Sequence, residues 1–191
     1  MKSQRMLPKV IAVLGGIAVV LPAALSARQS GGVGMPVADI AVRNGLPASD
    51  SELTPRVQAI VDHGDALTGA RHYAAAEREY HRAAAIVRGQ GHLPSYTLWH
   101  LACALYYEGN PEGAAVVLDQ LTSESQRYGD IAVQAVALFN SAWLSGQSGN
   151  GRVAAAKLDG VRKLLRSPYM PRSIRDQLSA RLAEPSRVAE R

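Results

Sequence analysis

The feature that most constrains this chain is a recurring alternation between helix-length apolar patterns and short turn signals, beginning at Thr54. Within each segment, apolar residues recur at the three- and four-residue spacing of one helix face. Thr54-Pro55 and Asn110-Pro111 each place an N-cap residue before a proline at the first helical position. No stretch of the sequence has the period-two alternation of a strand. The pattern therefore predicts an all-α fold.

The turn signals divide this part of the chain into seven predicted helices. Glycines supply most of the stops, including Gly89 and Gly109. Asp130 provides a further N-cap, and Ser173 begins a capping box with Asp176. The predicted helices run over about 55–69, 73–88, 94–108, 111–122, 131–145, 152–166 and 173–184.

The first six predicted helices form three pairs with small residues where the two helices approach each other. The second pair is the clearest, with Leu98, Leu101, Ala102 and Leu105 in one helix and Ala114, Leu118 and Leu121 in the next. The first pair has Ile60, Gly64, Leu67, Ala76, Tyr80 and Ala83, and the third has Leu138, Ala142, Ala154, Leu158 and Val161. Over residues 54–166 this pattern resembles the tetratricopeptide repeat (TPR) family, although the offsets of 38 and 40 residues exceed the family's usual period of about 34.

The resemblance implies an α-α superhelix of three TPR-like helix pairs plus a C-terminal capping helix. A single pair cannot bury its apolar face, so pairs must stack. The last predicted helix has one apolar stripe, made by Ile174, Leu178 and Leu182, as a terminal cap requires. A generic helical bundle is the alternative fold.

The N-terminal segment is typical of a secretory signal. Lys2, Arg5 and Lys9 precede an apolar run over 10–25, and small residues follow it. We expect residues 1–27 to be a signal peptide, with an N-terminal membrane anchor or a buried helix as alternatives. Residues 28–53, rich in Gly, Pro and Ser, are predicted to be a flexible linker, and 167–191 the capping helix and tail. The chain is therefore expected to be exported, periplasmic or secreted, and not a lipoprotein because no cysteine lies near the cut.

The net charge of +5 is unevenly distributed. Three of the positive charges belong to the predicted signal peptide, and residues 162–191 hold eight Lys and Arg against three acids. The rest of the chain is mildly acidic, so a nucleic-acid partner is not expected. The basic residues Arg162, Lys163 and Arg166 complement a helix dipole, and with Arg172, Arg175 and Arg181 they have the alternative of touching anionic lipid or an acidic partner.

Aromatic residues gather on two predicted helices. Six of the ten Phe, Trp and Tyr residues fall on 94–108 and 131–145. In TPR superhelices the corresponding positions line the concave groove, so the resemblance implies a partner-binding groove. Its residues are Tyr96, Trp99, His100, Cys103, Tyr106, Tyr107, Phe139, Asn140 and Trp143. Because these helices are apolar on both stripes, the alternative is that the aromatic stripe is core.

We predict a non-enzymatic scaffold that binds a protein or peptide, with no cofactor and no metal. Membrane contact is expected only if the N-terminal segment is retained, which would make the chain an anchored assembly factor. The competing prediction is a small metal-binding or hydrolytic protein that uses His100 and Cys103, for which the sequence shows no third member. Asp62, His63 and Asp65 are assigned to a solvated helix face. Family members that clamp a C-terminal carboxylate do so with Lys, Asn and Arg, and here only Asn140 and His100 resemble that clamp.

Overall fold

The computed structural model describes residues 54–183, and this part of the chain forms seven α-helices and no strand. The helices are α2 (Pro55–Gly69), α3 (Tyr73–Gly89), α4 (Ser95–Glu108), α5 (Pro111–Tyr128), α6 (Ile131–Gln147), α7 (Gly151–Leu165) and α8 (Arg172–Ala183). The predicted all-α class is confirmed. The predicted signal peptide 1–27, the linker 28–53 and the end of the tail, 184–191, lie outside the described residues.

The predicted N-caps are built as the sequence indicates. The Oγ1 atom of Thr54 accepts a hydrogen bond from the backbone N–H of Val57 at 3.4 Å. The side chains of Asn110 and Asp130 accept from the third residue beyond each, at 2.8 and 2.9 Å. Each cap satisfies a backbone donor that the helix itself leaves without a partner. At the other end of α4, Gly109 has φ 91°, a left-handed conformation that suits glycine.

Two predicted boundaries are wrong. α5 continues to Tyr128, six residues past its predicted end, because the polar residues there have partners inside the fold. Glu124 and Ser125 are buried, and Ser125 donates a hydrogen bond to the carbonyl of Leu121 at 2.6 Å. α8 begins at Arg172, so Ser173 lies inside the first turn instead of at the N-cap.

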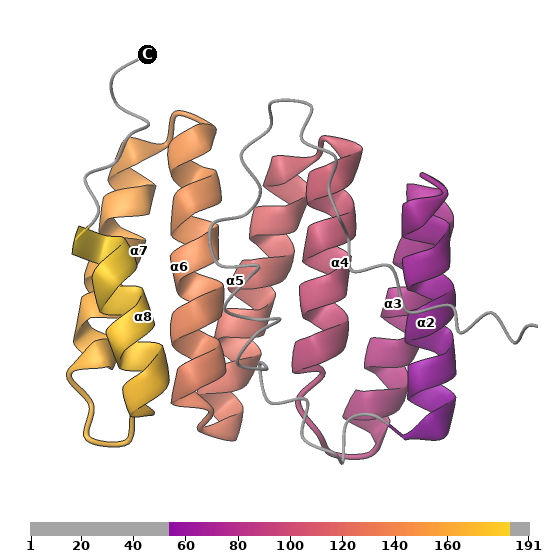
Figure 1. Cartoon of the computed structure of the whole chain (residues 1–191), viewed down its shortest axis with the longest axis horizontal. Coiled ribbons are helices and arrows are strands. Elements are labelled where there is room, and N and C mark those ends of the chain that lie inside the picture. Colours follow the sequence, from indigo (N-terminus) through magenta and orange to yellow (C-terminus); the bar gives the residue numbers. More distant parts are fainter. Residues whose placement is uncertain (1–53, 184–191) are drawn as a thin grey trace, which may run out of the picture. The chain divides into compact units, whose positions relative to one another are not determined.

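From α2 to α7, each helix packs against the next one along the chain, and successive helices run in opposite directions (Figure 1). α3, α5 and α7 finish at the bottom of Figure 1, and α2, α4, α6 and α8 begin there. We call this end of the helices the lower end. Small residues allow close packing within pairs. A Cβ on Gly64 would lie 2.7 Å from the Tyr80 ring, and one on Gly160 would lie 2.8 Å from Leu138.

α8 is held to the end of α7 by one apolar face and one arginine. Ile174 and Leu178 are buried and belong to the same core cluster as Leu165 at the end of α7. Arg175 donates hydrogen bonds to the carbonyls of Leu165, Ser167 and Met170 at 3.1, 2.9 and 3.2 Å. These carbonyls follow the last turn of α7, where intrahelical donors run out, so Arg175 acts as a side-chain cap.

Candidate functional site

All nine residues predicted for the partner-binding surface lie on α4 or α6, and the structure divides them into two groups. The first group is at least partly exposed, and the second is buried. The exposed or partly exposed residues are Tyr96, His100, Cys103, Tyr106, Tyr107 and Trp143, whereas Trp99, Phe139 and Asn140 are buried.

The three buried residues correct the predicted surface. Trp99 and Phe139 are only 4% and 7% exposed, and both belong to the hydrophobic core cluster. Asn140 has no exposed surface, and its Nδ2 donates to the carbonyl of Val136 at 2.8 Å. A partner therefore cannot reach these three side chains, and Asn140 is not available to bind a carboxylate. α4 and α6 are flanked by helices on both sides, so both of their apolar stripes are used for packing.

Three aromatic rings join α4 to α6 at the accessible part of this surface. The ring centroids of Tyr106 and Trp143 lie 5.8 Å apart, and those of Tyr106 and Tyr107 also lie 5.8 Å apart, in an edge-to-face arrangement. We call Tyr106, Tyr107 and Trp143 the aromatic cluster. Tyr107 is 36% exposed. Burial raises the pKa of both tyrosines, and for Tyr107 the neighbouring Cys103 and Tyr106 raise it further, so both phenols stay neutral at physiological pH.

A polar network joins α2, α3 and α4. The Oδ1 atom of Asp65 accepts a hydrogen bond from the Tyr80 hydroxyl at 2.7 Å and lies 2.7 Å from Nδ1 of His100. Thr68 lies 3.1 Å from the same hydroxyl. Burial raises the pKa of Tyr80, and the Asp65 carboxylate raises it further, while the hydrogen bond with Thr68 lowers it. Tyr80 is therefore a neutral donor, and we call Asp65, Thr68, Tyr80 and His100 the Asp65 network.

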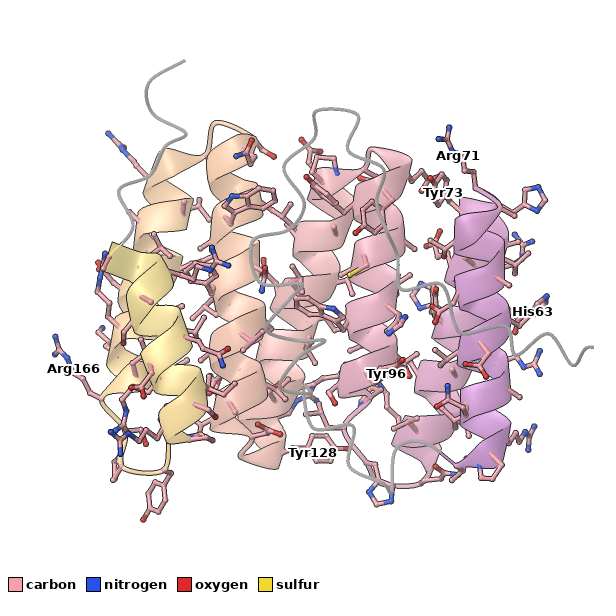
Figure 2. The ribbon with its side chains drawn as sticks, viewed as in Figure 1. His63, Arg71, Tyr73, Tyr96, Tyr128 and Arg166 are labelled. Atoms are coloured by element: carbon pink, nitrogen blue, oxygen red, sulfur yellow. The ribbon has the colours of Figure 1, made fainter. Side chains whose placement is uncertain are left out.

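Tyr96 extends this network toward the lower end of α4 (Figure 2). Its ring centroid lies 4.2 Å from that of His100, one helical turn further on. The prediction that Asp65 belongs to a solvated face is wrong, because its side chain is only 32% exposed and hydrogen-bonded. Asp62 and His63 are exposed as expected.

Cys103 follows His100 by three residues on α4. Burial, with a smaller contribution from the charge of Asp65, raises the pKa of its thiol to about 12. The thiol is therefore protonated at neutral pH, which is the weakly nucleophilic form. Among residues 54–183, no group of three or more His, Cys, Asp or Glu side chains is arranged to hold a metal ion.

Two polar groupings were not predicted from the sequence. One is the link of Asp65 and Tyr80 to His100, whose members are up to 35 residues apart. The other joins α5, α6 and α7: Lys157 Nζ lies 2.8 Å from both carboxylate oxygens of Asp119 and 2.6 Å from the Ser141 hydroxyl, which donates to Asp119 at 2.6 Å. Helical register would have placed Asp65 on the inner face of α2, but nothing local signals its partner.

Comparison with known proteins adds no relative from which a role could be transferred: no family model matches the chain, and no curated protein or solved structure matches it significantly. Within the part of the chain that the structure describes, no helix is long and apolar enough to cross a membrane.

Proposed function

We propose that this chain is an exported scaffold, without enzymatic activity, that binds a segment of a partner protein on the inner surface formed by α4 and α6. The observation that carries the proposal is the aromatic cluster. Tyr107 is exposed, and Tyr106 and Trp143 are partly buried beside it. Their aromatic rings offer a partner apolar surface, and the tyrosine hydroxyls and the indole N–H offer hydrogen-bonding groups next to it. Such side chains dominate binding energy at protein interfaces.

The proposal includes a TPR-like superhelix as the arrangement of the three helix pairs. Alternating helix directions and packing between successive helices support it. So do the close approaches at Gly64 and Gly160, which occur inside the first and third pairs, where TPR-like packing calls for small residues. In such an arrangement α2, α4 and α6 line one side, and this side carries both the aromatic cluster and the Asp65 network.

The chemistry of the surface favours an amphipathic or extended segment with polar groups at one end. The aromatic cluster offers an apolar contact near the C-terminal end of α4. The Asp65 network and Tyr96 offer hydrogen-bonding groups nearer the start of that helix, where His100 is 21% exposed. A partner that spans both surfaces would place apolar side chains on the aromatic cluster and a hydrogen-bond donor or acceptor on the Asp65 network.

A hydrolytic role for His100 and Cys103 is less well supported. Asp65 beside Nδ1 of His100 supplies the third group that the sequence lacked, at 2.7 Å. The thiol, however, has a pKa raised to about 12, whereas nucleophilic cysteines have lowered values. The scaffold is therefore the better proposal.

Site-specific photocrosslinking tests it. A photoreactive residue in place of Tyr107 should crosslink one discrete envelope protein, and the same residue at Val116, which is 66% exposed on α5, serves as the control. Trp143→Ala should then abolish the crosslink at 107 while circular dichroism shows an unchanged helix content. Equal crosslinking from positions 107 and 116, or undiminished crosslinking from position 107 in the Trp143→Ala variant, would refute the assigned surface.

A further inference from the structure

The lower end of the helices carries a row of basic residues. α3, α5 and α7 finish there, and each has a basic residue in its last turn: Arg88, Arg127, and Arg162 with Lys163. α2, α4 and α6 finish at the opposite end and have none in theirs. The helix dipole favours cations at helix C-termini, which accounts for part of this row.

Two exposed residues at the lower end are not explained by the dipole or by packing. Arg172 opens α8, where the positive end of the dipole disfavours a cation; its side chain is 92% exposed, and its Nε atom lies 3.7 Å from a carboxylate oxygen of Asp176, one turn further on. Tyr169, in the connection between α7 and α8, is 84% exposed, more than any other large hydrophobic residue described. The ion pair with Asp176 is exposed on both sides and leaves the Arg172 side chain open to solvent, so Arg172 extends the basic row and Tyr169 adds an aromatic ring to it.

The geometry points to an anionic phospholipid membrane as the binding partner of this end. We call Arg127, Tyr128, Lys163, Arg166, Tyr169 and Arg172 the basic end. All six residues are exposed, and Figure 2 shows Tyr128 and Arg166 toward the lower end, opposite Arg71. Lys and Arg near a surface of anionic lipid are attracted to it, and tyrosine places its ring at the headgroup level with its hydroxyl in water.

The charge balance favours an anionic partner at this end, and the exposed tyrosines favour a membrane over other anionic partners. Residues 159–183 hold six Lys and Arg against two acids, whereas residues 54–158 hold eight against nine. Tyr128 and Tyr169 are 48% and 84% exposed, and exposed tyrosine rings suit the interface between lipid headgroups and water.

Acylation of lysine tests this inference on the full-length chain. Lys163 is exposed at the basic end, whereas Lys157 is 16% exposed and paired with Asp119, so it is an internal reference. The protein is mixed with vesicles of phosphatidylcholine alone or with phosphatidylglycerol, treated with an amine-reactive ester, and analysed by mass spectrometry. On the anionic vesicles, acylation of Lys163 should slow at least about fivefold and recover in 1 M salt, while Lys157 is unchanged.

Matched charge variants identify the residues responsible. Arg166→Gln with Arg172→Gln should lower the binding constant derived from Lys163 protection about 30-fold, because each basic residue near an anionic surface contributes about fivefold. Arg71 lies at the opposite end, and so does Arg152, in the first turn of α7. Arg71→Gln with Arg152→Gln therefore removes the same charge away from the basic end and should change the binding constant less than about twofold. Tyr169→Ser, at a residue too exposed to support the fold, should give a smaller loss.

The inference fails if Lys163 is acylated equally fast on both kinds of vesicle, or if the two double variants lose protection equally. Protection by single-stranded RNA but not by anionic vesicles would also overturn it, in favour of a nucleic-acid surface. Because the readout is local to the basic end, it does not depend on whether the aromatic cluster binds a partner.

Discussion

Arg88 and Glu124 form the ion pair whose loss should affect the fold most. Two hydrogen bonds, of 3.1 and 2.8 Å, join the Arg88 guanidinium on α3 to both carboxylate oxygens of Glu124 on α5. Gln120 donates a third, at 2.8 Å. The Glu124 side chain is 7% exposed and that of Arg88 is 35% exposed. This ion pair therefore joins the first helix pair to the second, and its carboxylate is also held by the hydrogen bond from Gln120.

Arg88→Met should cost about 2–3 kcal/mol of the free energy of unfolding at pH 7. Removing one partner of a fully buried pair costs about 3–5 kcal/mol. The partial exposure of Arg88 reduces this, and Gln120 remains as a donor to Glu124. The double variant Arg88→Met with Glu124→Leu should lose far less than the single one, because no carboxylate is then left buried without its cation.

The cost should depend on pH in a defined direction. Burial alone would raise the pKa of Glu124, but the hydrogen bonds from Arg88 and Gln120 and the Arg88 charge hold it below its ordinary value of 4.5. The pKa of Glu124 is thus lower in the folded protein than in the unfolded chain. The ion pair of Arg88 and Glu124 therefore stabilises the fold fully above pH 4.5 and loses this contribution as the pH falls through the pKa of the folded state. Without Arg88, burial acts with less opposition and the pKa of Glu124 rises.

Urea unfolding followed by circular dichroism at pH 7 and at pH 3.5 measures both effects. The difference in unfolding free energy between the wild type and Arg88→Met should be largest at pH 7 and clearly smaller at pH 3.5. A loss below about 0.5 kcal/mol at pH 7, as for a surface pair, would refute the assigned burial of Glu124. A loss independent of pH would refute the electrostatic reasoning.

Three further predictions concern single side chains. Gly64→Ala should destabilise the fold by about 1–3 kcal/mol in thermal or urea unfolding, because its Cβ would lie 2.7 Å from Tyr80; the exposed Gly69→Ala, with open space around it, is the control and should be neutral or stabilising. Asn140→Leu, of similar shape, should leave the stability unchanged or raise it by about 1 kcal/mol, since the buried Oδ1 has no hydrogen-bond partner among the described residues; a large loss would contradict this. Cys103 should react with iodoacetamide much more slowly than a free thiol at pH 8 and accelerate toward pH 10 or above, because burial raises its pKa to about 12. Fast alkylation of the folded protein at pH 7 would show that the pKa of the thiol is not raised.

The helices of this chain were predictable because their signals are local. N-cap residues and glycine stops act within a few residues, and Thr54, Asn110 and Asp130 cap their helices as expected. The end of α5 was missed because Glu124 has its ion-pair partner 36 residues away. A polar run resembles a loop whenever the partner that buries it is distant in sequence.

The candidate site was predictable as a set of helices but not as a set of accessible side chains. Helical spacing places Trp99 and Tyr106 on one stripe of α4, yet the first is 4% exposed and the second is only partly buried. The difference arises from what packs over each residue, and this depends on neighbouring helices that no local pattern specifies. Asp65 shows the same limit, because its helical position was known but its contact with His100 was not.

The polar contacts between helix pairs have a role that apolar packing does not fulfil. Apolar contacts between helices are non-directional and tolerate sliding along the helix axis, whereas hydrogen bonds fix which residues face each other. Asp65 with His100 links α2 to α4, and Arg88 with Glu124 links α3 to α5. Lys157 with Asp119 and Ser141 links α5, α6 and α7. The first two bridges join the first helix pair to the second, and the third bridge joins the second pair to the third, so together they set the register of the three pairs.

That register determines the proposed binding surface. Tyr106 lies on α4 and Trp143 on α6, so their 5.8 Å contact exists only if the second and third pairs keep their relative height. Replacing Lys157 by methionine keeps much of the side-chain volume while removing the bridge to Asp119. If the bridges set register, this variant should weaken crosslinking from position 107 more than its loss of stability explains. If they contribute stability alone, crosslinking should follow the folded fraction.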